Sequence, residues 1–344
     1  MLQLLDLQKR LLPDLLDIMQ KRYHILKTIH ILQPVGRRTL AQTLGFTERV
    51  LRSEVEFLKE QNLIDIKTTG MSLTTEGVNI LEKLEGMMRE VSGINEMEKQ
   101  LKLRFGVKEV VIVDGNSDET PWVKEELGRA CIVSMKKRLA EKNIIAVTGG
   151  TTMAAVAEQL TPDFLKGELL FVPARGGIGE DVKNQANTIC AKMAEHTGAS
   201  HKVLYVPDQV SKEVYESFIK EPAIKEVLHL ITSANMVLHG IGDAITMANR
   251  RKTSPEDLDK IKKSGAVGEA FGYYFDEDGE VVHRVQTVGI QLKDLDRVEH
   301  VFAVAGGSSK AKAIQAYMKR APRSTILITD EGAARELLKM KNSK

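Results

Sequence analysis

A strand-to-helix junction in the middle of the chain combines glycines and hydroxyl side chains in a way that favours anion binding. The run NIIAVT, residues 143–148, is followed by Gly149, Gly150, Thr151 and Thr152 and then by the helix-like MAAVAEQL. Glycines permit close backbone approach, N–H groups and hydroxyls donate hydrogen bonds, and the helix dipole favours negative charge. Neither a Walker loop nor a G-x-G-x-x-G dinucleotide motif is present. The segment predicts an anion cradle, with a purely structural turn as the alternative.

A second pair of glycines lies near the other end of the chain, after the apolar run at residues 301–305. Gly306 and Gly307 are followed by Ser308, and Lys310 falls in the first turn of the next predicted helix. A cation at a helix N-terminus is electrostatically unfavourable unless an anion binds beside it. We therefore expect this loop to contact a second anionic group.

Two more predicted strand ends carry glycines. Arg175 is followed by Gly176 and Gly177, which suits a fork-shaped donor beside a close backbone approach, and residues 239–243 read His-Gly-Ile-Gly-Asp. In open α/β sheets, ligands bind beyond the carboxyl ends of the strands. The four loops therefore predict one small ligand with two anionic groups. A sugar bisphosphate fits better than a nucleotide, because only 5% of the residues are aromatic and could stack on a base.

Polar residues near these loops are candidates for contacts with sugar hydroxyls. Gln185 and Asn187 follow the third loop, two positions apart, and Glu269 follows a Val-Gly pair. Arg250 opens an Arg-Arg-Lys run, which is either a ligand contact or a solvated basic face.

The residues give weaker support for catalysis. His239, Asp243 and Glu269 could act as acid or base, but an acid on a glycine loop more often orients a backbone group or a hydroxyl. The eight histidines show no metal-ligand spacing, and His196 and His201 are interpreted as surface residues on either side of a turn. We expect no catalytic residue, no metal and no cofactor.

The N-terminal part of the chain predicts three helices and a hairpin. Residues 12–32 form a helix, because apolar side chains recur at three- and four-residue steps. A short helix over 39–44, a turn at Gly45, a longer helix capped by Thr47, and a hairpin over 63–74 follow. This order is that of a winged helix-turn-helix. The expected buried stripes are Leu15, Met19, Tyr23, Leu26 and Ile29 in the first helix and Val50, Leu51, Val55 and Leu58 in the third.

The third predicted helix and its surroundings carry the charge of a DNA-binding surface. Within residues 21–60, eight Lys and Arg stand against four acids. Basic side chains there would contact phosphates, and side chains on the third helix would read base edges. The alternative is a solvated charged helix in a winged helix that binds protein. The candidates for DNA contact are Arg37, Arg38, Thr47, Arg49, Arg52 and Ser53, and the last three of these would reach bases.

From residue 107 onward, short β-branched runs alternate with helical stretches. Apolar strands separated by helices indicate an α/β domain with a mostly parallel, doubly wound, Rossmann-like sheet covered on both faces. Residues 270–292 predict a hairpin instead, turning at Asp278-Gly279. The predicted strands lie within 109–114, 143–148, 168–173, 201–207, 227–242, 301–306 and 324–330.

Residues 76–104 carry no strand signal and keep three- and four-residue apolar spacing, interrupted only by Gly93. They predict a connecting helix whose stripe pairs with another subunit or packs within the chain. The expected domains are a winged helix-turn-helix over 1–75, the connecting helix over 76–104, and a ligand-sensing and oligomerisation domain over 105–344.

Composition excludes several classes of protein. The 344 residues are 42% hydrophobic and 28% charged, which fits two globular domains and excludes a disordered chain. The formal net charge is only +2, so any nucleic-acid surface must be local. Cys131 and Cys190 are expected to be free, buried thiols in a reducing compartment. The first residues make a poor signal peptide and no apolar run is long enough to span a membrane, so we expect a cytoplasmic protein.

The ordered set of motifs resembles the SorC family of sugar-responsive bacterial repressors. A winged helix alone is not specific, but the order of the loops is. The resemblance covers roughly residues 12–340. Its motifs are the winged helix over 36–74, TGGTT at 148–152, ARGG at 174–177 with Gln and Asn after it, GIGD at 240–243, VGE at 267–269 and AGGSSK at 305–310.

The resemblance implies a function as well as a fold. The large domain would share the fold of glucosamine-6-phosphate deaminases and ribose-5-phosphate isomerases, reused as a sensor. The protein would repress central glycolytic genes, form a homo-oligomer, dimer to tetramer, that assembles as a tetramer on its operator, and respond to fructose 1,6-bisphosphate. The alternative is a phosphosugar isomerase or deaminase with a DNA-binding appendage; the intact winged helix favours the regulator.

The resemblance also implies roles for individual residues. One phosphate would bind to Gly149, Gly150, Thr151 and Thr152. Lys310 and the loop of Gly306, Gly307 and Ser308 would also contact a phosphate, and Arg175, Gln185, Glu269 and Arg250 would complete the pocket.

Overall fold

The computed structural model describes residues 11–177, 181–207 and 210–340. It forms two compact units, Met1–Glu96 and Met97–Lys344, which are described separately below. The expected N-terminal domain begins, and the expected C-terminal domain ends, in residues that lie outside the described ranges, as do the first residues considered for a signal peptide.

Unit 1 contains the predicted helices and hairpin in the predicted order. The left-handed backbone of Gly45, with φ of 67°, ends α3, and the Thr47 hydroxyl accepts a hydrogen bond from the Val50 amide at 3.3 Å to cap α4. This confirms the winged helix-turn-helix. Its elements are α2 (Pro13–Leu32), α3 (Arg37–Leu44), α4 (Glu48–Glu60), β1 (Ile64–Lys67), β2 (Gly70–Leu73) and α5 (Thr75–Val91).

The core of unit 1 corrects two of the expected buried positions. Tyr23 and Ile29 are buried as expected, but Leu15 of α2 is 54% exposed and Val50 of α4 is 43% exposed. Leu16 is buried in α2. Successive helical side chains point about 100° apart, so an assignment wrong by one position places an apolar side chain in solvent.

The predicted connecting helix over 76–104 is in fact two helices, α5 and α6 (Ile94–Phe105). Gly93 separates them and has φ of 73°, a left-handed conformation that ends a helix. Leu81 and Met88 of α5 belong to the core of unit 1. In unit 2, Glu98 of α6 accepts a hydrogen bond from the Ile112 amide at 2.8 Å. The apolar residues of α5 thus pack within unit 1, and Leu101 of α6 is also buried, whereas pairing with another subunit stays a prediction.

Unit 2 is built on a seven-stranded parallel sheet with strand order β3-β13-β12-β7-β4-β5-β6. Every residue of β12 and β13 is buried, as expected for strands covered on both faces. This confirms the α/β fold class. The strands are β3 (Glu109–Val113), β4 (Lys142–Val147), β5 (Glu168–Pro173), β6 (Ser200–His201), β7 (Met236–Gly240), β12 (His300–Val304) and β13 (Thr325–Asp330).

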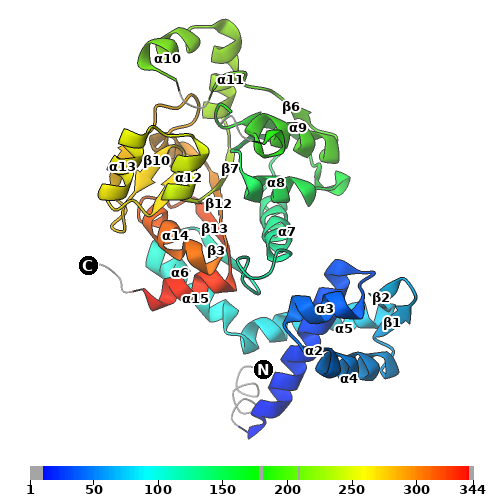
Figure 1. Cartoon of the computed structure of the whole chain (residues 1–344). Helices are drawn as coiled ribbons and strands as arrows, with labels where there is room; N and C mark the ends of the chain where they lie inside the picture. Colours follow the sequence, from blue (N-terminus) through cyan, green and yellow to red (C-terminus); the bar gives the residue numbers. More distant parts are fainter. Residues whose placement is uncertain (1–10, 178–180, 208–209, 341–344) are drawn as a thin grey trace. The chain divides into compact units, whose positions relative to one another are not determined.

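Helices cover both faces of this sheet. Helices α7, α8 and α9 pack side by side on one face, and α14 and α15 lie on the other (Figure 1). Right-handed crossovers place helices on opposite faces when the strand order reverses direction, as it does after β6. The helices are α7 (Val123–Lys136), α8 (Thr151–Glu158), α9 (Ala186–Thr197), α10 (Lys212–Phe218), α11 (Pro222–Thr232), α14 (Ala311–Met318) and α15 (Glu331–Lys339), with 3₁₀ turns η1 (Pro162–Phe164), η2 (Val182–Asn184), η3 (Leu292–Arg297) and η4 (Ser308–Lys310).

A small antiparallel sheet is inserted between β7 and β12 of unit 2. Its strand order is β11-β10-β9-β8, and the segment between β10 and β11 contains the predicted turn at Asp278-Gly279. Two helices pack on it: Ala244 and Ile261 of the helices form one apolar cluster with Tyr274 of the sheet. The elements are β8 (Gly242–Asp243), β9 (Gly268–Ala270), β10 (Tyr273–Phe275), β11 (Val281–Arg284), α12 (Ala244–Arg250) and α13 (Pro255–Lys263).

Two of the predicted strands differ from the structure. Of residues 201–207, only His201 is in a strand. The predicted strand over 227–242 begins instead as the second half of α11 and becomes β7 only at Met236. Apolar runs in buried helices and buried strands look alike in sequence, which explains the second error. None of the helices in the described ranges is long and apolar enough to cross a membrane.

Candidate functional site

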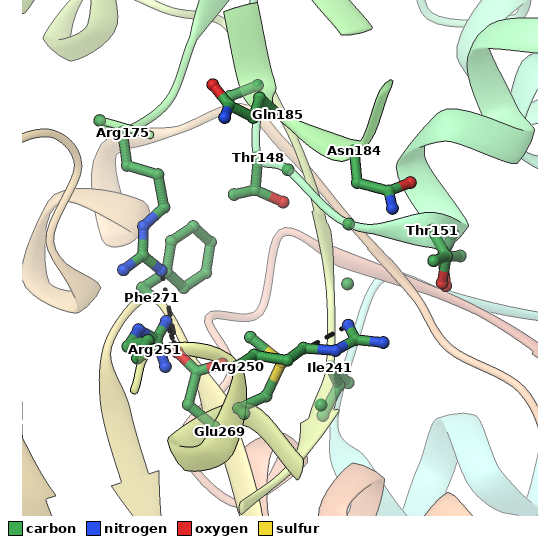
Figure 2. A pocket seen from close by; sticks show the side chains of 18 of the residues that line it. Thr148, Thr151, Arg175, Asn184, Gln185, Ile241, Arg250, Arg251, Glu269 and Phe271 are labelled. Carbon is green, nitrogen blue, oxygen red and sulfur yellow. Dashed lines mark hydrogen bonds and ion pairs between the residues drawn. The ribbon is translucent and has the colours of Figure 1, made fainter. Parts of the chain in front are cut away.

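A pocket opens at the carboxyl ends of four neighbouring strands, β12, β7, β4 and β5 (Figure 2). This is where open α/β sheets bind ligands. The empty volume is about 810 Å³, including solvent at its mouth. The lining residues are Thr148, Gly149, Gly150, Thr151, Thr152, Arg175, Gly176, Asn184, Gln185, Ala186, Gly240, Ile241, Gly242, Met247, Arg250, Arg251, Glu269, Phe271 and Lys310.

The first polar end of the pocket is the N-terminus of α8. Its N-cap residue, Gly150, has φ of 116°, which a side chain would strain, and no side chain caps the helix. The amides of the first turn therefore lack acceptors within the helix. Gly149 lies so close to the Asn184 carbonyl that a Cβ there would approach its oxygen to 2.7 Å. The two glycines let the chain make this turn, and Thr151, the first residue of α8, lines the pocket beside it (Figure 2).

The opposite polar end is a buried cluster of two arginines and a glutamate (Figure 2). Arg251 Nη2 lies 2.8 Å from Glu269 Oε1, and Arg175 Nη1 lies 3.8 Å from the same oxygen. The Gly272 amide also donates to Glu269 Oε1, at 2.6 Å. These three contacts all involve Glu269 Oε1 and hold the carboxylate at the wall of the pocket.

The pocket is strongly cationic. Among the described residues, its lining contains four cationic side chains, those of Arg175, Arg250, Arg251 and Lys310, against one carboxylate, that of Glu269. Burial lowers the pKa of Lys310 from its usual value, and the charges of Lys124 and Arg250 act in the same direction. Such a site attracts anions, because an anion relieves the repulsion between the cations.

The second glycine pair does not enter this pocket. Of the residues predicted for that loop, only Lys310 lines it; Gly306, Gly307 and Ser308 do not. The Gly307 amide donates to Asp330 Oδ2 at 2.7 Å, and the Ser308 amide donates to Asn116 Oδ1 at 3.2 Å. All the other predicted effector residues, namely Gly149, Gly150, Thr151, Thr152, Arg175, Gln185, Arg250 and Glu269, are brought together.

Three other residues considered for chemistry have structural contacts. Asn187 exchanges two hydrogen bonds with the backbone of Leu204, at 3.1 and 2.9 Å. Asp243 caps α12 by accepting from the Thr246 amide at 2.8 Å. His239 is buried beside Tyr317, and burial lowers its pKa to about 4, so the ring is neutral at physiological pH.

Sequence reasoning missed several lining residues, above all Arg251, Phe271 and Asn184. Arg251 lies in the Arg-Arg-Lys run, but no spacing distinguishes its buried side chain from the half-exposed one of Arg250. Thr148, Gly240 and Gly242 also line the pocket. They belong to glycine loops that are recognisable in the sequence, and these loops could have identified them.

The candidate DNA-binding face of unit 1 lies on α3 and α4. Arg37 and Arg38 occupy the first turn of α3, where a phosphate would offset the unfavourable helix dipole. Arg49 and Ser53 are exposed on α4. Arg52 forms an exposed i,i+4 ion pair with Glu56 at 2.8 Å, which a DNA phosphate or base could replace.

Metal binding finds no support in the described ranges, where no group of three or more His, Cys, Asp or Glu residues could hold an ion. Cys131 and Cys190 are free and buried, and burial raises their pKa well above the usual range. Neither thiol is placed for nucleophilic or redox chemistry.

The two units match two known families. Residues 18–88 match the family described as "CggR N-terminal DNA binding domain", and residues 89–339 match the one described as "Putative sugar-binding domain". The central glycolytic genes regulator of Bacillus subtilis (strain 168) is 60% identical over 337 residues, which is 98% of this chain and 99% of that protein. Its counterpart in Priestia megaterium is 62% identical over 340 residues, 98% of this chain and 99% of that protein.

A solved structure agrees with these matches. A SorC family transcriptional regulator from Enterococcus faecalis is 49% identical, with a TM-score of 0.67, and covers 71% of this chain and 99% of its own. The chain belongs to the SorC family. Another SorC-family structure, the full-length sorbitol operon regulator of Klebsiella pneumoniae, is 18% identical with a TM-score of 0.62 over 89% of this chain and 94% of its own, and it supports the fold. As a SorC-family member, the chain is a DNA-binding, sugar-responsive transcriptional regulator and not an enzyme.

Proposed function

We propose that this SorC-family regulator represses genes of central glycolysis and that fructose 1,6-bisphosphate, bound in the pocket of unit 2, releases it from its operator. Two relatives at 60% and 62% identity carry the name central glycolytic genes regulator. The observation that carries the choice of effector is the pocket itself, which has an anion-binding helix N-terminus on one side and a cationic cluster on the other. A ligand with a phosphate at each end satisfies both.

One phosphate of the effector would bind at the N-terminus of α8. The exposed amides and the hydroxyls of Thr151 and Thr152 donate to its oxygens, and Gly149 and Gly150 let them approach. The cationic side chains of Arg175, Arg250 and Lys310 would neutralise the remaining charge. Gln185 and Glu269 would bind sugar hydroxyls.

DNA binding is assigned to the winged helix of residues 1–75. In this assignment Arg37, Arg38 and Thr47 contact the phosphate backbone, and Arg49, Arg52 and Ser53 enter the major groove. Residues 76–104 connect this domain to the sensing and oligomerisation domain of residues 105–344. Operator half-sites require at least a dimer, and two dimers form a tetramer on a longer operator. The protein would act in the cytoplasm, where both glycolytic intermediates and DNA are found.

The test compares ligand binding in the presence and absence of DNA. Calorimetry with fructose 1,6-bisphosphate, fructose 6-phosphate and ribose 5-phosphate ranks the effectors on the full chain. Fluorescence anisotropy with DNA from the promoter region of its glycolytic genes then measures operator affinity at each ligand concentration. We expect the bisphosphate to bind best and to weaken DNA binding by about 5- to 150-fold, the usual range of allosteric coupling.

Linkage makes this test strict. If the bisphosphate weakens operator binding, saturating operator must weaken bisphosphate binding by the same factor. Equal ligand affinities for the free protein and for its complex with operator would rule out induction by this ligand. Tighter binding of a monophosphate would instead reassign the effector.

A further inference from the structure

The glycine loop that the sequence assigns to a phosphate is occupied by a carboxylate of the protein itself. Asp118, in the loop between β3 and α7, places its side chain against Ser308 and Ser309. Its Oδ2 accepts from the Ser309 amide at 2.8 Å and from the Ser308 hydroxyl at 3.2 Å, and its Oδ1 accepts from the Ser309 hydroxyl at 3.1 Å. These are the donors that a bound phosphate would have used.

The backbone around this carboxylate is shaped for it. Gly307 has φ of 102°, and a Cβ at that position would lie 2.4 Å from Asp118 Oδ1. Asn116 of the same loop donates to the Ser308 hydroxyl at 3.2 Å and accepts from the Ser308 amide at 3.2 Å. The Gly-Gly-Ser-Ser sequence therefore makes room for Asp118, and the amides of Gly307, Ser308 and Ser309 are already paired.

Asp118 also compensates the positive charge of Lys310, the residue that follows Ser309. Lys310 stands at the N-terminal end of α14, where the helix dipole disfavours a cation, and it shares the pocket with Arg250. Burial acts to raise the pKa of Asp118, but hydrogen bonds from Ser309 and Ser308 and the charge of Lys310 hold it below the usual value. In return, Asp118 and Asp330 oppose the effects that lower the pKa of Lys310.

We infer that Asp118 is a positioning residue for the effector site: its carboxylate holds the Ser308–Lys310 turn so that Lys310 can present its ammonium group to a ligand phosphate. The inference rests on the proposed function, because it assumes that Lys310 contacts the effector. It also changes the picture of this loop, since the phosphate meets the Lys310 side chain and does not enter the Gly306–Ser309 backbone.

The opposite role is physically distinct and can be tested against this one. If a ligand phosphate displaced Asp118 and took over the amides of Ser308 and Ser309, the carboxylate would be a competitor. Its removal would then tighten effector binding. Under the inference drawn here, its removal weakens binding, and only through Lys310.

The experiment is a double-mutant cycle on the full chain, read by calorimetry with fructose 1,6-bisphosphate. The variants are Asp118→Asn, Lys310→Ala and the two combined. Asp118→Asn keeps the shape of the side chain and removes its charge. Glu119→Gln is the matched control, because Glu119 is the neighbouring exposed acid and contacts Asn116 at 3.0 Å but not the Ser308–Lys310 turn.

We expect Asp118→Asn to weaken bisphosphate binding by about five- to tenfold. Lys310→Ala should weaken it by about 10- to 150-fold, as for the loss of a charged hydrogen bond. The double variant should bind like Lys310→Ala alone, because Asp118 has nothing left to position. Glu119→Gln should bind like the unchanged protein. A merely structural role for Asp118 would instead add its effect to that of Lys310→Ala.

Each other outcome overturns a definite statement. Unchanged or tighter binding by Asp118→Asn contradicts the positioning role, as does an additive double variant. If the unchanged protein fails to bind the bisphosphate, the proposed function fails first and the role of Asp118 fails with it. Matching unfolding midpoints for Asp118→Asn and Glu119→Gln would show that the binding change does not come from loss of fold.

Discussion

Arg251 and Glu269 form a buried ion pair in the wall of the pocket, with 2.8 Å between Arg251 Nη2 and Glu269 Oε1. Their side chains are only 1% and 4% exposed. Arg251 Nη1 also donates to the Tyr274 hydroxyl at 3.0 Å. Because Tyr274 lies in the core of the inserted antiparallel sheet, this pair ties the pocket-lining carboxylate of Glu269 to a rigid support.

Replacing one member of this pair should be costly. Arg251→Met leaves the Glu269 carboxylate buried without its main partner, and breaking such a pair costs about 3–5 kcal/mol. We expect the free energy of unfolding of unit 2 to fall by an amount of this order and bisphosphate affinity to fall with it. Urea unfolding followed by circular dichroism measures the first quantity.

The combined variant Arg251→Met, Glu269→Gln separates stability from binding. Removing both charges should restore much of the lost stability, because the closer ion pair is removed as a unit and only Arg175, 3.8 Å from Glu269 Oε1, loses its carboxylate. Ligand binding should stay weak, because a neutral amide at position 269 accepts a weaker hydrogen bond from a sugar hydroxyl than the carboxylate does. Full recovery of bisphosphate affinity in this variant would remove Glu269 from the site.

The hydroxyls at the start of α8 give a second prediction. Thr151→Val and Thr152→Val each delete a donor to a charged phosphate oxygen, which is worth roughly 1.5–3 kcal/mol, and keep the side-chain shape. We expect each variant to reduce the free energy of bisphosphate binding more than it reduces the free energy of unfolding. Thr232→Val is a suitable control, because Thr232 is exposed on α11 and its hydroxyl bonds only to helical carbonyls. Calorimetric affinities equal to that of the control would place the phosphate elsewhere.

The recognition helix gives a third prediction. Arg52→Ala should weaken operator binding by about 5- to 150-fold and relax specificity at one base pair, while ligand affinity stays unchanged. Arg335→Ala is a matched control, because Arg335 makes an i,i+4 ion pair with Glu331 in unit 2 just as Arg52 does with Glu56. Anisotropy titrations against single-base operator variants measure both effects. Parent-like binding by Arg52→Ala and by Arg49→Ala would show that the DNA-contacting face is misassigned.

A fourth prediction concerns pH. Burial lowers the pKa of His239 to about 4 in the folded protein, compared with 6.5 for an unperturbed histidine. The unfolded chain therefore binds more protons between these two values, and folding stability falls as the pH drops from about 6.5 to about 4. Above this window the contribution is fully present. The whole effect is about 3 kcal/mol.

The variant His239→Gln isolates this contribution from the titration of carboxylates. Its side chain does not titrate and can still bond to Tyr317, which lies 3.0 Å from the ring nitrogen. Between pH 6.5 and 4, the unfolding free energy of the unchanged protein should fall more steeply than that of the variant. Parallel pH profiles in urea unfolding would show that His239 is not held neutral by burial.

The local patterns of the sequence were enough to predict the architecture of both units. Thr47 and Gly45 mark helix ends because capping and left-handed backbone depend on residues next to each other in the chain. The TGGTT loop could be recognised for the same reason, since its glycines, hydroxyls and following helix are contiguous. Because all parallel strands point their carboxyl ends to one edge, three of the four glycine loops line one pocket, and the fourth contributes only Lys310.

Only the tertiary structure decided which of these residues meet and which side chain satisfies which donor. Spacing could not show that Asp118, 190 positions before Ser308, occupies the second glycine loop. Nor could it separate Arg251, buried against Glu269, from the neighbouring Arg250, because both sit in one basic run. Hydrogen bonds between segments distant in sequence depend on the fold that brings the segments together. The local chemistry of each loop can therefore be predicted from the sequence, whereas the fold of the unit decides which of its charges pair.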